Sequence, residues 1–265
     1  MNKNILKLLA ALTMVIDHAG LLLFPQAAVL RWIGRISFPL FAFCVGDGCV
    51  HTRKPGVYFW RVLGLGLACQ IVFAAEELLD GGTLRGSQAL YLNILFTLAL
   101  AILLCTSFLR LQRQPNAKNA AVCAAAMLAV AGADMLCQAI TARTGVLVTF
   151  DYGAMGAFLP LFAVLSQEKH QRFVLFSLGM AIYCLTQCGD MPYVWWSLLA
   201  LPILWCYNGQ PGCRGWKWAF YVWGDRIFEK CGIRRDEGGD GGKTLEIRGK
   251  RRLSARDGSA NYQQS

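Results

Sequence analysis

The sequence predicts an all-α fold, a polytopic integral membrane bundle of about eight transmembrane helices with a basic, disordered C-terminal tail. Three observations carry this prediction. Hydrophobic residues make up 55% of the 265 residues and charged residues only 16%, against about 25% in soluble domains. The apolar residues gather in long runs, and half of the net charge of +10 lies after Tyr207. This composition excludes a soluble enzyme and a disordered protein.

Eight apolar runs approach the roughly 20 residues that a helix needs to cross a bilayer core of about 30 Å. In chain order they are residues 5–24, 33–50, 57–75, 90–109, 120–140, 146–165, 173–189 and 191–207. Three runs are short, and the last two meet almost without a loop, where a tight re-entrant pair is the alternative to two crossings. The number of helices therefore carries a tolerance of one or two. A signal peptide is the alternative for the first run, but the polar pair Asp17 and His18 lies inside it.

The loops alternate in charge. Basic residues concentrate at the N-terminus, in the second, fourth and sixth loops, and after the eighth run. They are Lys3, Lys7, Arg53, Lys54, Arg61, Arg110, Arg113, Lys118, Lys169, Arg172, Arg214 and Lys217. The opposite loops hold only Arg31, Arg35, Arg85 and Arg143, together with Glu76, Glu77 and Asp80. The positive-inside rule therefore predicts a multi-pass protein of the cytoplasmic (inner) membrane with both termini in the cytoplasm.

Composition divides the chain into three predicted segments. Residues 1–207 form the transmembrane domain, residues 208–235 an aromatic and basic interfacial segment, and residues 236–265 a disordered tail. The tail either attracts anionic lipid or is a solvated segment without a role. Because no fold presents its charge to nucleic acid, membrane lipid is a predicted partner and nucleic acid is not.

Ionisable and amide side chains inside apolar runs are costly in lipid and mark candidate functional sites. Asp17 and His18 are the sharpest pair, because histidine can take a proton near neutral pH and a neighbouring carboxylate can orient it. Lys7 precedes His18 by 11 residues, which returns to the same helix face about 16 Å away. A histidine satisfied within the bundle is the alternative. The other buried polar residues are Asp47, Gln70, Asn93, Asp134 and Asp151.

Basic residues near the ends of the second run are candidates for binding phosphate. Arg35 can hold a phosphate or carboxylate as a fork, or can anchor the helix at the interface. His51, Arg53 and Lys54 can meet the phosphates of a nucleotide-bearing cofactor, or can simply set topology. The 11 cysteines include no C-x-x-C pair, so neither a disulfide framework nor a metal site is expected.

Several ordered motifs resemble the TraX family of polytopic membrane proteins, named for the N-acetylation of conjugative pilin. Residues 13–20 match the pattern T-M-x-I-D-H-x-G, and residues 34–43 match G-R-I-[AS]-F-P-x-F-A-F. Further matches, in order, are Asp47-Gly48, His51-Thr52-Arg53, Cys69-Gln70-Ile71, residues 92–98, Asp151-Tyr152-Gly153 with Gly156, and Tyr207-Asn208-Gly209. The resemblance covers roughly residues 5–221.

The TraX family in turn is similar to the membrane-bound acyltransferase-3 group, whose hallmark is a basic residue, ten residues and a histidine, as Lys7 and His18 are spaced here. The resemblance implies an acetyltransferase with acetyl-CoA as the donor. His18 would be the catalytic base, Asp17 would orient it, and the acceptor would be a pilin amine, a surface glycan hydroxyl or a small molecule. The residues that would hold the donor are Lys7, Arg35, His51, Arg53 and Lys54.

The chain departs from the family pattern near its end. The family continues after Tyr-Asn-Gly into F-Y-x-x-Y-P-x-H, whereas residues 220–225 read Phe-Tyr-Val-Trp-Gly-Asp. Two alternatives to the acetyltransferase follow: a non-enzymatic membrane protein of transport or assembly, and an inactive, truncated member of the family.

Overall fold

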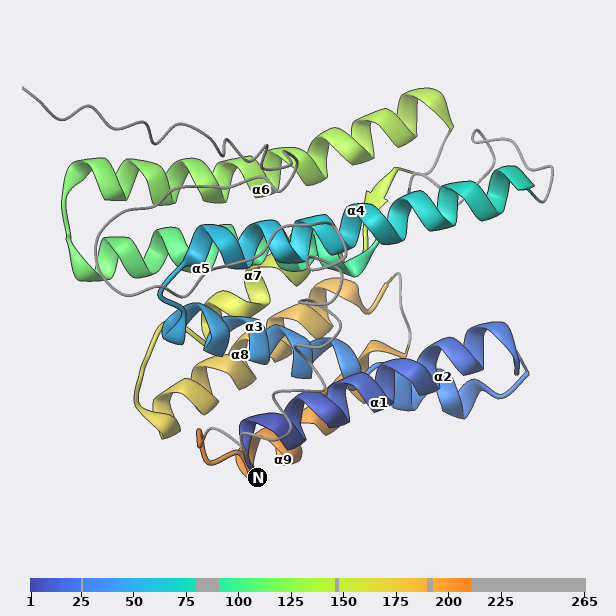
Figure 1. Cartoon of the computed structure of the whole chain (residues 1–265), viewed down its shortest axis with the longest axis horizontal. Coiled ribbons are helices and arrows are strands. Elements are labelled where there is room, and N and C mark those ends of the chain that lie inside the picture. The colour runs from blue at the N-terminus through green and yellow to red at the C-terminus, as the bar shows by residue number, and fades with distance from the viewer. Residues whose placement is uncertain (25, 80–90, 146–147, 190–192, 211–265) are drawn as a thin grey trace, which may run out of the picture. The chain divides into compact units, whose positions relative to one another are not determined.

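The computed structural model describes residues 1–24, 26–79, 91–145, 148–189 and 193–210, and this part of the chain is mostly α-helical (Figure 1). The elements are α1 (Lys3–Leu22), α2 (Ala28–Gly34), α3 (Ser37–His51), α4 (Pro55–Leu79), β1 (Tyr91–Leu92), α5 (Ile94–Arg113), α6 (Ala117–Thr144), β2 (Thr149–Phe150), α7 (Gly153–Phe162), α8 (Lys169–Gln187), the 3-10 helix η2 (Val194–Leu199) and α9 (Ala200–Trp205). The predicted helical fold is confirmed. The two-residue strands pair in parallel. The predicted tail (residues 236–265) and the predicted interfacial segment after residue 210 lie outside the described residues, as do Asp80 and Arg85.

Four helical segments of the described residues are long and apolar enough to cross a membrane. They are Ala28–His51, Pro55–Val72, Ile94–Arg113 and Ala117–Thr144. In an 18-residue apolar stretch of each segment, only 6% of the second and 22% of the fourth are buried within the protein, so most of the apolar surface there needs a lipid environment. The membrane character that the sequence predicts is supported, while the count of about eight helices stays a prediction.

The sixth apolar run differs from the full-length helix that the sequence suggests, and the eighth run, already short in the sequence, is divided. In the sixth run, β2 and a turn precede α7, which has 10 residues and a length of about 15 Å. Tyr152 at this turn has a left-handed φ of 66°. Because a right-handed helix cannot continue through this conformation, α7 begins only after Tyr152. The eighth run contains η2 and α9, of six residues each. Continuous apolar composition therefore did not produce continuous helices here.

The described helices pack in three layers (Figure 1). One layer contains α4, α5 and α6, a middle layer contains α3, α7 and α8, and the last contains α1, α2 and α9. Helix α3 contacts α1, α5 and α7, and ten of its 15 residues are buried. Its side chains form the centre of the core with Ile102 of α5 and Phe176 and Met180 of α8. A polar residue on α3 is thus held inside the protein.

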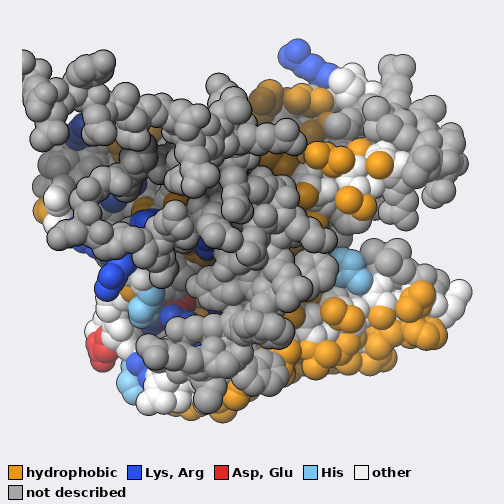
Figure 2. Space-filling model, viewed as in Figure 1, with side chains coloured by type: hydrophobic (Ala, Val, Ile, Leu, Met, Phe, Trp, Pro, Cys, Tyr) orange, Lys and Arg blue, Asp and Glu red, His pale blue; other side chains and the backbone are white. Residues whose placement is uncertain are grey.

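Apolar side chains also cover the outside of the described helices. Figure 2 shows them gathered over the α1–α2 layer and over α4. Large exposed examples on the predicted spans are Trp60, Ile71, Val72, Leu128, Met135 and Leu136. Exposed apolar surface of this extent is typical of helices that face lipid.

Close packing of α3 against α7 depends on Gly46. A Cβ atom placed there would lie 2.7 Å from the Pro160 carbonyl oxygen and 2.9 Å from Ala163 Cβ. We expect Gly46→Ala to lower the free energy of unfolding by about 1–3 kcal/mol, because the backbone must shift to admit the methyl group. Thermal unfolding in detergent measures this change. Gly64→Ala in α4 is the matched control, since nothing lies within 4 Å of a Cβ there; equal unfolding temperatures for both variants would contradict the account.

Candidate functional site

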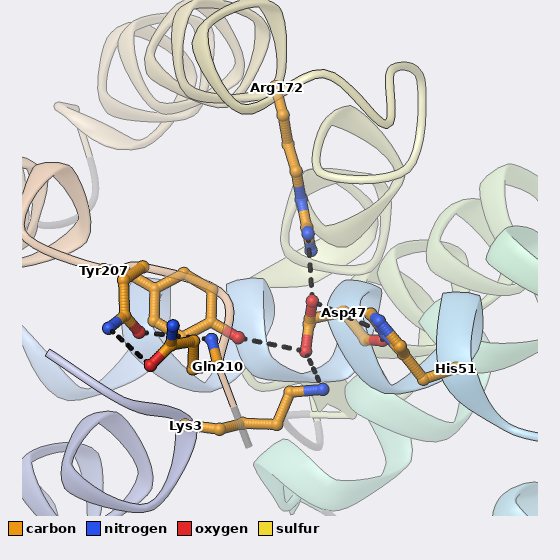
Figure 3. A network of polar contacts seen from close by, with 7 residues as sticks. Lys3, Asp47, His51, Arg172, Tyr207 and Gln210 are labelled. Carbon is orange, nitrogen blue, oxygen red and sulfur yellow. Dashed lines mark hydrogen bonds and ion pairs between the residues drawn. The ribbon is translucent and has the colours of Figure 1, made fainter. Parts of the chain in front are cut away.

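A buried carboxylate, Asp47 of α3, gathers cations and a hydroxyl from distant parts of the chain (Figure 3). Lys3 Nζ lies 2.6 Å from its Oδ2, and Arg172 Nη1 lies 2.9 Å from its Oδ1. The Tyr207 hydroxyl donates to Oδ2 at 3.3 Å. Since the Asp47 residue is only 3% exposed, these contacts provide the hydrogen bonds that a buried carboxylate requires. We name Lys3, Asp47, His51, Arg172 and Tyr207 the Asp47 cluster.

His51 joins this cluster through its position one helical turn after Asp47. Its Nδ1 lies 2.8 Å from the Asp47 backbone oxygen and 3.6 Å from Oδ1 of the carboxylate. A carbonyl oxygen can only accept, so the neutral imidazole carries its proton on Nδ1. The His51 side chain is 57% exposed, and its other ring nitrogen, Nε2, takes no part in this hydrogen bond.

Backbone hydrogen bonds support the same junction. The Lys3 N–H donates to the Gln210 oxygen at 3.0 Å, and the Asn208 N–H donates to the Met1 oxygen at 3.0 Å. The first residues of α1 are therefore joined to residues 207–210 by backbone as well as side chains. The Asp47 cluster ties together α1, the end of α3, the start of α8 and the segment after α9.

A cavity of about 330 Å³ lies beside the Asp47 cluster. The residues that give it polar character are Asp47, His51, Lys169, His170, Arg172 and Tyr207. The Arg172 guanidinium lies 4.5 Å from the centroid of the Phe43 ring. Its Nε and Nη2 atoms are buried and have no hydrogen-bond partner among the described residues. A cationic, partly enclosed cavity of this kind can receive an anionic group.

A second polar cluster joins α1 to α2. Asp17 Oδ2 accepts a hydrogen bond from Arg31 Nη1 at 2.9 Å, and Arg35 Nη2 lies 4.0 Å from Asp17 Oδ1. A side chain at Gly34 would overlap Asp17, so glycine permits the two helices to approach. Trp32 of α2 stacks on Trp196 of η2 with centroids 5.0 Å apart.

His18 has different partners from its neighbour Asp17. It is exposed on α1, and its Nδ1 lies 2.8 Å from the Met14 backbone oxygen. The Asp17 carboxylate instead contacts Arg31 and Arg35. The orientation of His18 in this structure thus comes from the Met14 carbonyl, and not from Asp17 as the sequence suggested.

The basic residues expected to hold a donor do not come together. His51 lines the 330 Å³ cavity, whereas its described lining includes none of Lys7, Arg35, Arg53 and Lys54. Lys7, Arg53 and Lys54 are exposed, and Arg35 lies beside Asp17. The structure therefore separates Arg35, which lies beside Asp17 near the end of α1, from His51, which lies beside Asp47 near the start of α1.

The remaining polar residues that the sequence predicts inside apolar runs are half-buried and hydrogen-bonded. Asn93 accepts from the Leu95 N–H at the start of α5 and donates to the Gly66 oxygen at 2.9 Å and to Gln70 Oε1 at 3.3 Å. Asp134 accepts from Gln138 at 3.0 Å. These contacts give both residues a role in packing or capping helices.

Asp151 likewise contributes its backbone to the structure. Its carbonyl oxygen accepts from the Thr97 hydroxyl at 2.6 Å, and its N–H donates to the Leu92 oxygen at 3.0 Å. The two hydrogen bonds fix the turn between β2 and α7 against the start of α5.

The two clusters agree with the charge pattern of the loops. The Asp47 cluster draws on segments that the pattern assigns to the cytoplasm, and Arg31 and Arg35 belong to an opposite loop. Lys3 and Asp17 are 14 residues apart on α1, about 21 Å along the axis. Segments predicted to share a side of the membrane thus lie at the same end of the described bundle.

This agreement leads to a prediction about topology. Reporter domains fused after Lys118 and after Lys169 should be cytoplasmic, and one fused near Gly82 should be external. Activity of a reporter that functions on only one side of the membrane measures the location. An external signal after Lys169 would show that the short apolar runs do not cross in the predicted order.

Metal binding has no support from the described residues, which include no group of three or more His, Cys, Asp and Glu side chains able to hold a metal ion.

Long apolar helices with buried ion pairs at their ends define a helical integral membrane protein. The family model described as TraX protein matches residues 2–224. The chain therefore belongs to the TraX family, and the resemblance seen in the sequence motifs is confirmed.

Two curated relatives match parts of the chain. It is 34% identical over 105 residues to the probable fimbrial assembly protein FimC, serogroup H1, of Dichelobacter nodosus, covering 37% of this chain and 43% of the relative. It is 48% identical over 61 residues to an uncharacterized protein of Rickettsia prowazekii (strain Madrid E), covering 23% and 25%. The chain thus spans less than half the length of each relative. No solved structure gives a significant match.

Proposed function

We propose that this protein is a multi-pass membrane acetyltransferase that moves an acetyl group from acetyl-CoA to an amine or hydroxyl of a pilus or fimbrial subunit. Membership of the TraX family, which is named for pilin acetylation, supports this function. The match to a fimbrial assembly protein supports the class of acceptor. A position in the cytoplasmic membrane would give the protein access to acetyl-CoA in the cytoplasm and to subunits inserted in the bilayer.

The observation that carries the proposal is the hydrogen bond of His18. Its Nδ1 lies 2.8 Å from the Met14 carbonyl oxygen, and a carbonyl has no proton to donate. The neutral imidazole must therefore carry its proton on Nδ1, which leaves the lone pair on Nε2. This tautomer is the one that a general base needs, and here the preceding helical turn fixes it.

In the proposed reaction His18 takes a proton from the acceptor and later gives it to the leaving thiolate. The acceptor nitrogen or oxygen attacks the carbonyl carbon of the acetyl thioester while its proton passes to Nε2. The carbon–sulfur bond breaks next, and the leaving thiolate takes that proton from Nε2. The imidazole returns to its starting form, so the transfer requires no further reactant.

Asp17, Arg35 and Lys7 have supporting roles in this proposal. Asp17 is a positioning residue, because its ion pairs with Arg31 and Arg35 hold α2 against the helix that carries His18. The guanidinium of Arg35, whose side chain is only 12% exposed, supplies positive charge to the carboxylate next to the base. Lys7 lies on the exposed surface of α1, between the Asp47 cluster and His18.

An assembly role without chemistry is the second candidate, favoured by the name of the fimbrial assembly relative. In that case the buried ion pairs only maintain a docking surface for a subunit. Pilus or fimbria production restored by a His18→Gln variant would support this candidate, because glutamine cannot take a proton.

Membranes that contain the protein provide the test of the proposed activity. Incubation with labelled acetyl-CoA should transfer the label to a membrane-associated acceptor, and membranes without the protein should not. Treatment with hydroxylamine then separates the acceptor classes, because it cleaves acetyl esters of hydroxyls and leaves acetyl amides intact. An equal amount of label in both membranes would contradict the proposal.

A further inference from the structure

We infer that the 330 Å³ cavity beside the Asp47 cluster is a phosphate-binding site. The identity of the ligand rests on the proposed function, because acetyl-CoA is then the donor and its phosphates would bind in the cavity. The cavity lies at the predicted cytoplasmic end of the bundle, at the junction of α3, α8 and the segment after α9. Its charge, its arginine and its size each support this assignment.

The charge of the cavity is positive. Asp47 is the one carboxylate in its described lining, which also contains Lys169 and Arg172. Lys3 and Arg172 both form ion pairs with this carboxylate, at 2.6 Å and 2.9 Å. Lys3, Lys169 and Arg172 together carry more positive charge than Asp47 balances, and an anion of one or two charges would restore the balance.

Arg172 offers a bidentate edge. Its Nη1 is occupied by Asp47 at 2.9 Å, while Nε and Nη2 form the adjacent edge of the planar guanidinium. Both atoms are buried and have no partner in the described part of the chain. Two parallel N–H donors on one edge match the oxygens of a phosphate, which would reach them once the covered edge moves toward the cavity. The Phe43 ring at 4.5 Å and the Asp47 carboxylate fix the plane of the group.

The first turn of α8 adds to this arrangement. Lys169, His170 and Arg172 all line the cavity, and they begin a helix of 19 residues. The N-terminal end of a helix carries a partial positive charge that favours anions. His170 and His51 supply exposed imidazole groups at the rim, and an N–H of His170 can donate to a phosphate oxygen.

The size of the cavity limits which part of a ligand it can hold. A volume of about 330 Å³ is near the lower end of the range of small-molecule sites, so a phosphate-bearing end fits and the whole donor does not. Lys3 and His18 are 15 residues apart on α1, about 22 Å along the helix. The thioester would therefore reach His18 through the extended arm of the donor, with its phosphates held at the other end.

Phosphate groups can come from a nucleotide or from a lipid headgroup, and three probes separate these sources. The purified protein in uncharged detergent is titrated with CoA, with pyrophosphate and with short-chain phosphatidylglycerol, and each dissociation constant is measured. We expect Lys169→Glu to weaken the binding of CoA and pyrophosphate about tenfold, because the charge reversal replaces attraction by repulsion. Higher ionic strength should weaken the same binding.

Lys118→Glu is the matched control. Lys118, like Lys169, is an exposed lysine in the first turn of a long helix, and the charge pattern assigns both to the same side of the membrane. The control variant should bind all probes within about twofold of the wild type. Arg172→Lys keeps the charge but loses the fork, and should weaken CoA binding about tenfold. Its unfolding temperature without ligand reports whether the Asp47 ion pair is preserved.

The outcomes distinguish this site from the proposed activity. Weaker CoA binding in Lys169→Glu and unchanged binding in Lys118→Glu support the site and its donor. If wild-type protein binds phosphatidylglycerol but not CoA, and Lys169→Glu weakens that binding, the phosphate site stands and the acetyl donor loses its support. If Lys169→Glu and Lys118→Glu bind every probe equally, the inference is wrong, even where the wild type transfers acetyl groups.

Discussion

Replacement of His18 by glutamine or asparagine is expected to lower the rate of acetyl transfer by about 10²–10⁴-fold. Asparagine can reproduce the donor at Nδ1, which lies 2.8 Å from the Met14 oxygen, while glutamine places an amide near Nε2. Neither amide can take a proton, so both variants lack the base. The rate is measured in membranes with labelled acetyl-CoA and matched amounts of protein.

Protein stability provides the control for these variants. His18 is exposed on α1, so neither substitution should change the unfolding temperature or the amount of protein in the membrane. A purely structural histidine gives the opposite pattern, in which asparagine retains the hydrogen bond and full activity. Wild-type activity in either variant would contradict a general-base role for His18.

Replacement of Asp47 is expected to produce the largest loss of stability. Asp47→Asn removes the charge that balances Lys3 and Arg172, whose side chains are 23% and 12% exposed. Breaking a buried ion pair by removing one partner costs about 3–5 kcal/mol, because the other partner stays buried and unpaired. We expect a large fall in the unfolding temperature in detergent and less protein in the membrane.

Asp134→Asn is the matched control for this substitution. Asp134 accepts a hydrogen bond from Gln138 on the same helix and forms no ion pair with another described residue, so its loss should cost less than about 1 kcal/mol. The Arg172→Met background gives a second check, since Asp47→Asn should destabilise that protein less than the wild type. Equal losses in the two backgrounds would show that Asp47 and Arg172 are not coupled.

The long helices could be predicted well from apolar composition. The fourth and fifth apolar runs, residues 90–109 and 120–140, correspond to α5 (Ile94–Arg113) and α6 (Ala117–Thr144). Their ends carry local signals, because Asn93 caps the start of α5 and Gly145, with φ of 69°, follows α6. The start of α7 has no such signal, since the left-handed residue that precedes it is Tyr152 and not glycine.

The candidate site could be predicted only in part. Asp17, His18 and Asp47 were found because charge inside an apolar run is costly in lipid, and His51 was found because it lies one turn from Asp47. The partners of Asp47 could not be found in this way. Arg172 is 125 residues away and Tyr207 is 160 residues away, so only the packing of α3, α8 and α9 reveals the contacts.

The roles of neighbouring residues also differ from those that sequence order suggests. Asp17 and His18 are adjacent, but successive side chains on a helix point about 100° apart. The Asp17 carboxylate consequently faces Arg31 of α2, and the His18 imidazole donates to the Met14 carbonyl oxygen one turn earlier in α1. Lys3 and Arg172, which the sequence assigned only to topology, provide the charge around Asp47.

Transfer of acetyl groups by the purified protein is the most direct test of the central claim. The protein is reconstituted in lipid vesicles with labelled acetyl-CoA and a fimbrial or pilin subunit as the acceptor. Our account predicts that wild-type protein labels the subunit in proportion to the protein added, and that His18→Gln labels it at least 10²-fold more slowly. Labelling no greater than in vesicles without the protein would contradict the account.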